Sequence, residues 1–198
     1  IRDVYKRQDL PHLAYNPSAH LAIVDIVLGV ADILPIHGFG YLVPRNATNN
    51  SDEILGVIFD SDAVPNQSQR LTKLTVMMGG PYWRHHSSFP SEDDVKERAL
   101  RALHSQLGLS LLTLTSHLEN IYARVMTDTI PQYLVGHPQR MAELKAAIKM
   151  HPQWRNRLSL LGYSYGGVGV NDCIANAMDT CDAICNYEQN KSPLSDTS

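Results

Sequence analysis

The residues of this sequence that could do chemistry lie near its end, in a glycine-rich segment between an apolar stretch and a helix-forming stretch. The segment contains Gly166, Gly167 and Gly169, and glycines remove side chains from the approach to a helix N-terminus. Unpaired backbone N–H groups and the positive end of the helix dipole face outward there, which favours anions and electron-rich carbonyl groups. A tight turn that needs a positive φ at glycine would have the same composition.

Two catalytic patterns overlap this segment, and the sequence argues against both. Residues 167–172 begin like a dinucleotide fingerprint, but Asp172 stands where the third glycine belongs. Residues 162–166 fit the G-x-S-x-G pattern of a hydrolase, with Ser164 as the nucleophile. That serine would need a histidine base downstream, and no histidine follows His151. We therefore predict neither a complete dinucleotide motif nor a serine hydrolase.

The elements that must position this segment begin with a set of strands. Stretches rich in β-branched or alternating apolar residues predict five of them, at residues 19–30, 38–43, 54–61, 71–80 and 117–126. The first four are closely spaced and separated by turn-forming loops, which indicates an antiparallel meander. A shorter apolar stretch at residues 158–163 predicts a buried strand directly before the glycines.

Three segments predict helices. A capping box at residues 91–94 precedes an apolar rhythm that Gly108 ends. Pro138 stands where a second helix would begin, ahead of helix formers at residues 139–150. A third helix at residues 171–185 would be capped by Asn171 or Asp172 and carries an apolar stripe of Ile174, Ala177, Met178, Cys181 and Ile184. This order of elements predicts a mixed fold class, α+β or α/β.

The composition of the 198 residues excludes several classes of protein. Seventeen basic and 20 acidic residues give a net charge of −3, which leaves no basic surface for nucleic acid. No apolar run reaches the ~18 residues of a membrane span. The cysteines are odd in number and lack C-x-x-C spacing, so we expect small buried residues at Cys173, Cys181 and Cys185. The adjacent His85 and His86 are expected in a surface loop, and no metal site is predicted.

Residues 162–175 (GYSYGGVGVNDCIA) resemble the C-terminal flavin motif of the oxygen-dependent protoporphyrinogen oxidases. Four further blocks resemble the same family in the same order, at residues 37–44 (HGFGYLVP), 54–62 (ILGVIFDSD), 75–80 (TVMMGG) and 130–137 (IPQYLVGH). The ordered set is much more specific than any single block, and it is closer to the eukaryotic branch of the family.

The resemblance implies part of a flavin amine oxidase-like fold. It predicts a portion of a mostly antiparallel substrate-binding domain at residues 10–125. Residues 126–186 would be the C-terminal portion of an FAD-binding domain, which the last strand and helix complete. Residues 1–9 are expected to be a leader foreign to the fold, and residues 187–198 a disordered tail. The family's N-terminal glycine motif and membrane-binding region have no match, so we expect a partial sequence that is inactive by itself.

The activity implied by the resemblance is oxidation of protoporphyrinogen IX to protoporphyrin IX with oxygen, late in haem synthesis, with FAD as the cofactor. The cofactor carries this chemistry, and the protein supplies position and exclusion of water. The resemblance also implies the mitochondrial inner membrane, peripheral membrane association through an unmatched region, and a protein that could form a homodimer. Another flavin amine oxidase, or a non-catalytic binding module on the same fold, stays open as an alternative.

The resemblance assigns binding residues but no catalytic side chain. Four residues would contact the flavin or cap the helix behind it: Val168, Gly169, Val170 and Asn171. Four others would belong to the substrate wall: Phe39, Gly40, Leu42 and Met77. Ordinary core packing is the alternative for the three large side chains among them. No role follows for Tyr82 and Trp83.

Overall fold

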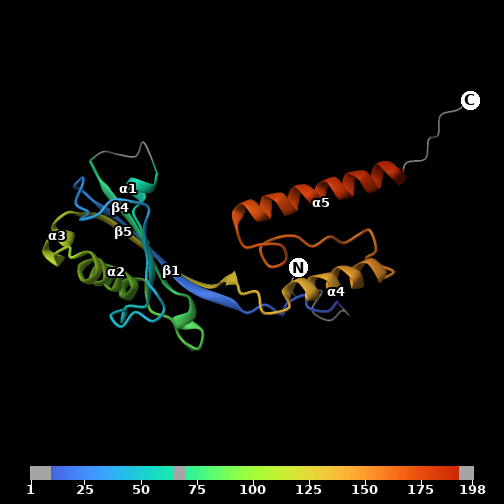
Figure 1. Cartoon of the computed structure of the whole chain (residues 1–198), viewed down its shortest axis with the longest axis horizontal. Coiled ribbons are helices and arrows are strands. Elements are labelled where there is room, and N and C mark those ends of the chain that lie inside the picture. Colours follow the sequence, from blue (N-terminus) through green and yellow to red (C-terminus); the bar gives the residue numbers. More distant parts are fainter. Residues whose placement is uncertain (1–9, 65–69, 192–198) are drawn as a thin grey trace, which may run out of the picture. The chain divides into compact units, whose positions relative to one another are not determined.

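The computed structural model describes residues 10–64 and 70–191, and it divides the chain into two compact units. One unit comprises Ser18–Thr129, and the other combines the residues up to Pro17 with those from Ile130 onward. We call them the sheet unit and the helical unit and describe each by itself (Figure 1). The predicted boundary lies at residues 125 and 126, and residues 10–17 fall in the helical unit rather than with the sheet. The predicted leader at residues 1–9 lies outside the described residues.

The sheet unit contains a five-stranded sheet in the order β2-β3-β4-β1-β5. Its strands are β1 (Ser18–Leu28), β2 (Gly40–Leu42), β3 (Ile54–Ile58), β4 (Thr72–Gly79) and β5 (Leu118–Pro131). The five strands predicted between residues 19 and 126 are thus confirmed, and β2, β3 and β4 form the expected antiparallel meander. β1 differs from that expectation because it pairs antiparallel with the far side of β4 and lies between β4 and β5.

The core of the sheet unit lies between one face of the sheet and α2 (Glu92–Leu107). Side chains alternate across a strand, so every second residue of β1 and β4 is buried there: Ala22, Val24, Ile26, Leu28, Leu74, Val76 and Met78. The helix contributes the residues predicted from its spacing: Val95, Ala99, Ala102 and Leu103. Burying each large aliphatic side chain stabilises the fold by roughly 1.5–3 kcal/mol. The intervening strand residues, among them Ile23 and Met77, belong to the opposite face and are half-buried.

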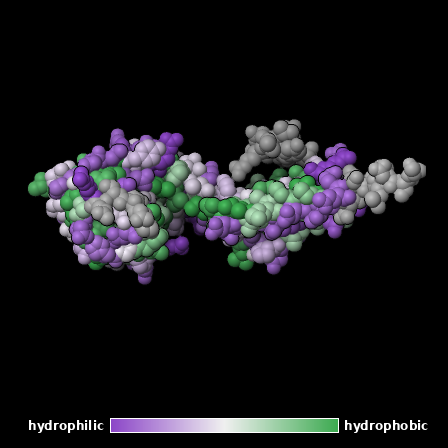
Figure 2. All heavy atoms as spheres, turned by 90° about the horizontal axis from the view of Figure 1, so that it is seen from above, coloured by the Kyte–Doolittle hydropathy of each residue, from purple (hydrophilic) through white to green (hydrophobic). Residues whose placement is uncertain are grey.

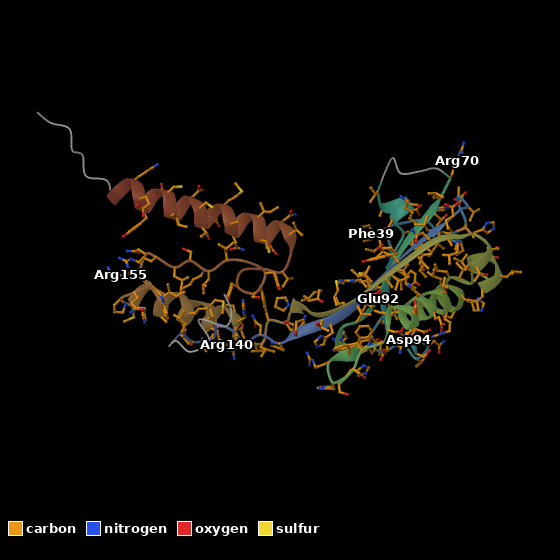
Figure 3. All side chains as sticks on the ribbon, turned by 180° about the vertical axis from the view of Figure 1, so that it is seen from behind. Phe39, Arg70, Glu92, Asp94, Arg140 and Arg155 are labelled. Carbon is orange, nitrogen blue, oxygen red and sulfur yellow. The ribbon has the colours of Figure 1, made fainter. Side chains whose placement is uncertain are left out.

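The ends of α2 follow the sequence prediction. Ser91 Oγ accepts a hydrogen bond from the Asp94 backbone N–H at 3.1 Å, and Asp94 Oδ2 accepts one from the Ser91 backbone N–H at 3.1 Å. This reciprocal pair is a capping box, and Glu92 and Asp94 lie in the first turn (Figure 3). Hydrogen bonds from Ser91 hold the pKa of the Asp94 carboxyl below its ordinary value. Gly108 ends the helix with a left-handed φ of 72°.

Three short helices have no counterpart in the sequence prediction, because four to six residues are too few to show a helical period. They are α1 (Asp60–Ala63), the 3-10 helix η1 (Gly80–Trp83) and α3 (Leu111–Ser116). η1 gives Tyr82 and Trp83 a structural role. Trp83 is fully buried and donates its indole N–H to Glu53 Oε2 at 2.8 Å, while the Tyr82 hydroxyl accepts from Asn50 at 3.0 Å.

The helical unit is built on α4 (His137–Met150) and α5 (Val170–Lys191). α4 begins as predicted, with Pro138 in its first turn after a left-handed Gly136. Its buried residues form a small core with Trp154: Met141, Leu144 and Ile148. Residues 10–17 join this core through Leu10 and Tyr15. None of the helices in the described part of the chain is long and apolar enough to cross a bilayer.

The prediction of a strand at residues 158–163 is wrong. Residues 158–161 have no regular secondary structure, and residues 162–165 form a bend and a turn. Leu158 and Leu160 still pack on the helical core, so the apolar pattern correctly indicated burial. A strand also needs a neighbouring strand to complete its backbone hydrogen bonds, and the described part of the helical unit has no sheet to supply one.

The predictions for the last helix need three corrections. The helix begins at Val170, so Gly169 rather than Asn171 or Asp172 holds the cap position. The expected disordered tail begins too early, because α5 continues to Lys191, while residues 192–198 lie outside the described residues. Finally, Cys181 and Cys185 are exposed rather than buried, since no residue of α5 belongs to the core clusters of the described chain.

Candidate functional site

The start of α5 is closed by its own third residue. Asp172 Oδ2 accepts a hydrogen bond from the Gly169 backbone N–H at 3.2 Å, and the Gly169 carbonyl accepts the first bond of the helix from Cys173 at 3.0 Å. This is the arrangement of a cap residue, with the side chain at the third helical position bonding back to the cap backbone. The sequence correctly indicated a polar residue at the helix start. It predicted Asn171 or Asp172 as the cap residue, whereas the side chain of Asp172 bonds back to the cap residue Gly169.

The glycines before α5 differ in how closely side chains of α5 approach them. Gly167 has a φ of +136°, and a Cβ atom there would lie 2.5 Å from Asp172 Cβ. A Cβ at Gly166 would lie 2.6 Å from the Asn176 amide nitrogen. Gly169 has no positive φ, and its Cβ would meet only the movable carboxylate of Asp172 at 3.0 Å. A side chain at residue 169 would therefore mainly fill the space at the helix start, without straining the backbone.

The surface that this turn presents is apolar. Val168 is 50% exposed and Val170 is 76% exposed, and Asn171 is exposed beside them. We define these residues with Gly169 as the contact turn. The carboxylate of Asp172 already occupies the positive end of the helix, so the contact turn does not favour a phosphate at this position.

The backbone of residues 163–167 is held by side chains that sequence reasoning missed. Tyr133 donates its hydroxyl to the Tyr163 carbonyl at 2.5 Å and accepts from the Gly167 backbone N–H at 2.8 Å. On the other side, Asn176 donates to the Gly166 carbonyl at 3.0 Å. Burial raises the pKa of the Tyr133 phenol above its ordinary value, so the hydroxyl keeps its proton. The sequence offered one signal for these side chains, because Tyr133 lies within the block at residues 130–137 that resembles the family.

In the sheet unit, three of the four predicted substrate-wall residues lie on the sheet face opposite α2. Leu42 pairs with Gly56, and Gly56 pairs with Met77, so these residues form one row across β2, β3 and β4. Gly40 lies in the next row on the same face, opposite Ile58. Leu42 is 79% exposed, and Met77 is half-buried. Neither side chain belongs to the hydrophobic core. Core packing was the alternative that the sequence left open for both of them.

Phe39 and Gly40 complete this set at the start of β2. Phe39 is 72% exposed and is also absent from the core (Figure 3). Gly40 has a φ of +139°, and a Cβ there would collide with the Val57 carbonyl oxygen. The segment before Phe39 is anchored by Asp62, whose Oδ2 accepts from the Gly38 N–H at 3.0 Å and lies 3.1 Å from His37 Nδ1. The hydrogen bond from Gly38 lowers the pKa of the Asp62 carboxyl.

Two carboxylates on the same sheet face were not anticipated. Thr75 Oγ1 lies 2.8 Å from Asp60 Oδ2 and 3.0 Å from Asp25 Oδ1, one row from Met77. Burial raises the pKa of the Asp60 carboxyl, and the charge of Asp25 adds to this. A negatively charged group of a ligand would avoid this row, whereas an apolar or N–H-bearing surface would not.

Metal chemistry gains no support from the described residues. No group of three or more histidine, cysteine, aspartate or glutamate side chains is placed to hold a metal ion in that part of the chain. His85 and His86 are exposed in the loop after η1, as predicted. Ser164 precedes α5 by six residues, so the strand, turn and helix of a hydrolase elbow are not present around it.

Comparison with known proteins first defines the fold. A solved structure from Exiguobacterium sp. 255-15, provisionally named a protoporphyrinogen oxidase, matches with a TM-score of 0.71 at 24% identity. The match covers 90% of this chain and 37% of that protein, so the chain has the fold of part of a larger protein. No protein-family model matches the chain.

Curated relatives then show which proteins the chain is similar to in sequence. The chain is 35% identical over 168 residues to protoporphyrinogen oxidase of Schizosaccharomyces pombe, covering 83% of this chain and 32% of the relative. It is 33% identical over 162 residues to the enzyme of Homo sapiens, covering 79% of this chain and 32% of the relative. The chain is therefore homologous to the protoporphyrinogen oxidases and spans about a third of the length of the curated relatives it matches.

Proposed function

We propose that this chain forms part of an FAD-dependent oxidase that converts protoporphyrinogen IX to protoporphyrin IX with oxygen. The observation that carries the proposal is the similarity to curated protoporphyrinogen oxidases over four-fifths of the chain, at 32–35% identity. The exposed apolar contact turn supports the proposed cofactor. The partly exposed row of Leu42, Gly56 and Met77 on the sheet supports the proposed substrate.

In this proposal the contact turn holds the flavin by its backbone. Val168 and Val170 cover the ring with apolar surface, and Asn171 lies in the first turn of α5, where backbone N–H groups have no partner within the helix. Gly169 lets the ring approach because it carries no side chain. An FAD held there would supply the two-electron oxidation of the substrate, with oxygen as the final acceptor.

The sheet face would form part of the wall against the macrocycle. Phe39, Leu42 and Met77 offer apolar surface to a flat, mostly apolar tetrapyrrole, and Gly40 leaves the backbone of β2 uncovered. Asp25 and Asp60 would keep the substrate's propionates away from the row around Thr75. The chain's own residues thus bind and orient, and no side chain is proposed to transfer a proton.

Location and partners follow from the same similarity. We propose a mitochondrial inner-membrane enzyme, since the curated relatives include fungal and mammalian proteins of this name. Membrane association would be peripheral and would use a region outside this chain, and a homodimer is compatible with the proposal.

The test uses the full-length protein that contains this chain. We expect bound flavin in its absorption spectrum and porphyrin fluorescence that grows when protoporphyrinogen IX is supplied in air. Gly169→Leu should remove flavin binding, because the added side chain occupies the space at the helix start. Ala183→Leu adds bulk at an exposed position further along α5 and should leave the flavin in place.

A second pair of variants tests the substrate wall. Leu42→Ala should raise KM for protoporphyrinogen IX by roughly three- to tenfold while flavin content stays constant, as expected for losing part of one apolar contact. Leu112→Ala is the control, because Leu112 on α3 is 78% exposed, almost the same as Leu42. A folded full-length protein that binds no flavin would instead favour the non-catalytic binding module.

A further inference from the structure

The contact turn depends on a clamp formed by Tyr133. Its hydroxyl has one proton to donate, which goes to the Tyr163 carbonyl, and it accepts from the Gly167 N–H. The two bonded groups are four residues apart, and both precede the contact turn. Gly167 directly precedes Val168, so any movement of Gly167 moves the first residue of the contact turn.

Tyr133 is itself fixed by a second aromatic layer. Its ring stacks on His137, with centroids 3.7 Å apart and planes inclined by 7°. His137 Nε2 lies 3.2 Å from the Tyr165 carbonyl, which can only accept, so Nε2 carries the proton. His137 Nδ1 is then free to accept from the Tyr15 hydroxyl, and Arg140 lies 4.9 Å above the Tyr15 ring. Arg140 itself is labelled in Figure 3. Moving the Tyr133 ring would therefore break its stacking on the buried His137.

Side chains of α5 bind two further backbone groups near the contact turn. Asn176 holds the Gly166 carbonyl, and Asp172 holds the Gly169 N–H. These side chains connect the segment to α5, as does Cys173, whose thiol donates to the Gly167 carbonyl at 3.7 Å. His137 connects it to α4 through the Tyr165 carbonyl. Gly167, with its φ of +136°, has no preferred geometry of its own, since glycine samples this region freely. The Tyr133 hydroxyl selects one of the conformations that Gly167 could adopt.

We infer that Tyr133 is a positioning residue that sets the distance and tilt of the contact turn against the flavin. The inference rests on the proposed function, because it concerns the flavin that the contact turn would hold. It goes further by assigning a role to a side chain that touches the turn rather than the cofactor. Its hydroxyl, not its ring, carries the effect, because both bonds to the turn use that one atom.

Tyr133→Phe tests this directly, because it keeps the ring stacked on His137 and removes only the hydroxyl. In the 198-residue chain, amide hydrogen exchange at Gly167 should become roughly three- to tenfold faster, the factor expected for losing one hydrogen bond. Tyr122→Phe is the control, since Tyr122 is an exposed tyrosine of β5. Unchanged exchange at Gly167 in Tyr133→Phe would overturn the clamp.

The full-length protein gives the second readout. Tyr133→Phe should bind flavin with shifted absorption bands and a changed midpoint potential relative to wild type and Tyr122→Phe, because the ring meets an altered backbone. If the wild-type protein binds flavin and Tyr133→Phe shows the same spectrum and midpoint potential, the positioning role is overturned. The proposed function is unaffected by that outcome. A wild-type protein without flavin would instead overturn the proposed function, and with it the role of Tyr133 toward a cofactor.

Discussion

Single side chains decide how this chain responds to pH, and Tyr41 is the clearest example. Its ring packs against the core of the sheet unit, and its hydroxyl donates to Gln106 at 2.8 Å. Burial raises the pKa of this phenol from 10.0 to about 12. A group whose pKa is raised by folding favours the folded state below the unfolded pKa and loses that contribution as the pH rises through the folded pKa.

We therefore expect the free energy of unfolding to fall between pH 10 and about 12, by roughly 1–2 kcal/mol after allowance for solvent screening. Tyr41→Phe should be less stable at pH 7, because it loses the bond to Gln106, but its deficit should shrink above pH 10. Denaturant unfolding of both proteins at pH 7, 10 and 11.5 measures this. A deficit that is constant at all three pH values would contradict the assignment to Tyr41, since every other tyrosine is present in both proteins.

At the scale of elements, the capping box is the feature that ties α2 to its start. Ser91→Ala removes the acceptor for the Asp94 backbone N–H and should lower stability by about 1 kcal/mol. Ser87→Ala, in the exposed loop before the helix, is the control and should have no measurable effect. Thermal unfolding followed by circular dichroism would compare the two.

The same element gives a prediction at acid pH. Because the bonds from Ser91 lower the pKa of Asp94, the carboxylate stabilises the fold above the ordinary value of 3.8, and this is lost as the pH falls through the lower folded pKa. Ser91→Ala should therefore show a weaker dependence of stability on pH below 4.

The elements also show what sequence patterns can and cannot predict. β1 and β4 alternate clearly between buried and half-buried residues, so both were predictable from a period of two. The order β4-β1-β5 was not, because pairing partners are chosen by contacts between residues distant in the sequence. Residues 158–163 have the composition of a strand without a partner to pair with, and composition cannot reveal that difference.

The candidate site likewise contains residues that the sequence could predict and residues that it could not. Its glycines and apolar residues were predicted from the resemblance, since they belong to short contiguous blocks. Tyr133, Asn176 and Asp60 were missed as site residues because their roles depend on partners ten to 34 residues away. A polar residue in a matched block is visible in the sequence, but the backbone group that it will bind is not.

At the scale of the whole molecule, the apolar stripe of α5 is the main departure from a closed globular surface. The large residues of the stripe are exposed in the described chain: Ile174, Met178 and Ile184. Hydrophobic atoms are visible at the surface of the helical unit (Figure 2). Monomeric proteins rarely leave a large apolar face uncovered, so this stripe should bind apolar molecules from solution.

We expect the 198-residue chain to bind a hydrophobic dye such as ANS in its folded state. Ile174→Lys with Met178→Lys should reduce dye fluorescence at least twofold without lowering the unfolding midpoint, because neither side chain is buried. Ala183→Lys with Gln189→Lys adds the same charge at other exposed positions of α5 and should leave dye binding unchanged. A lowered midpoint in the first variant would mean that the stripe packs within the chain.

The discontinuity of the helical unit also sets the order of events during synthesis. The sheet unit is continuous, so all of its residues have emerged once Thr129 leaves the ribosome. Asn16, by contrast, donates to the carbonyl of Ser164, which is made 148 residues later. At roughly 5–20 residues per second, that interval lasts about 7 to 30 seconds. Residues 10–17 therefore reach their partner Ser164 only after the sheet unit is free to fold, and the contact turn is made after the sheet unit.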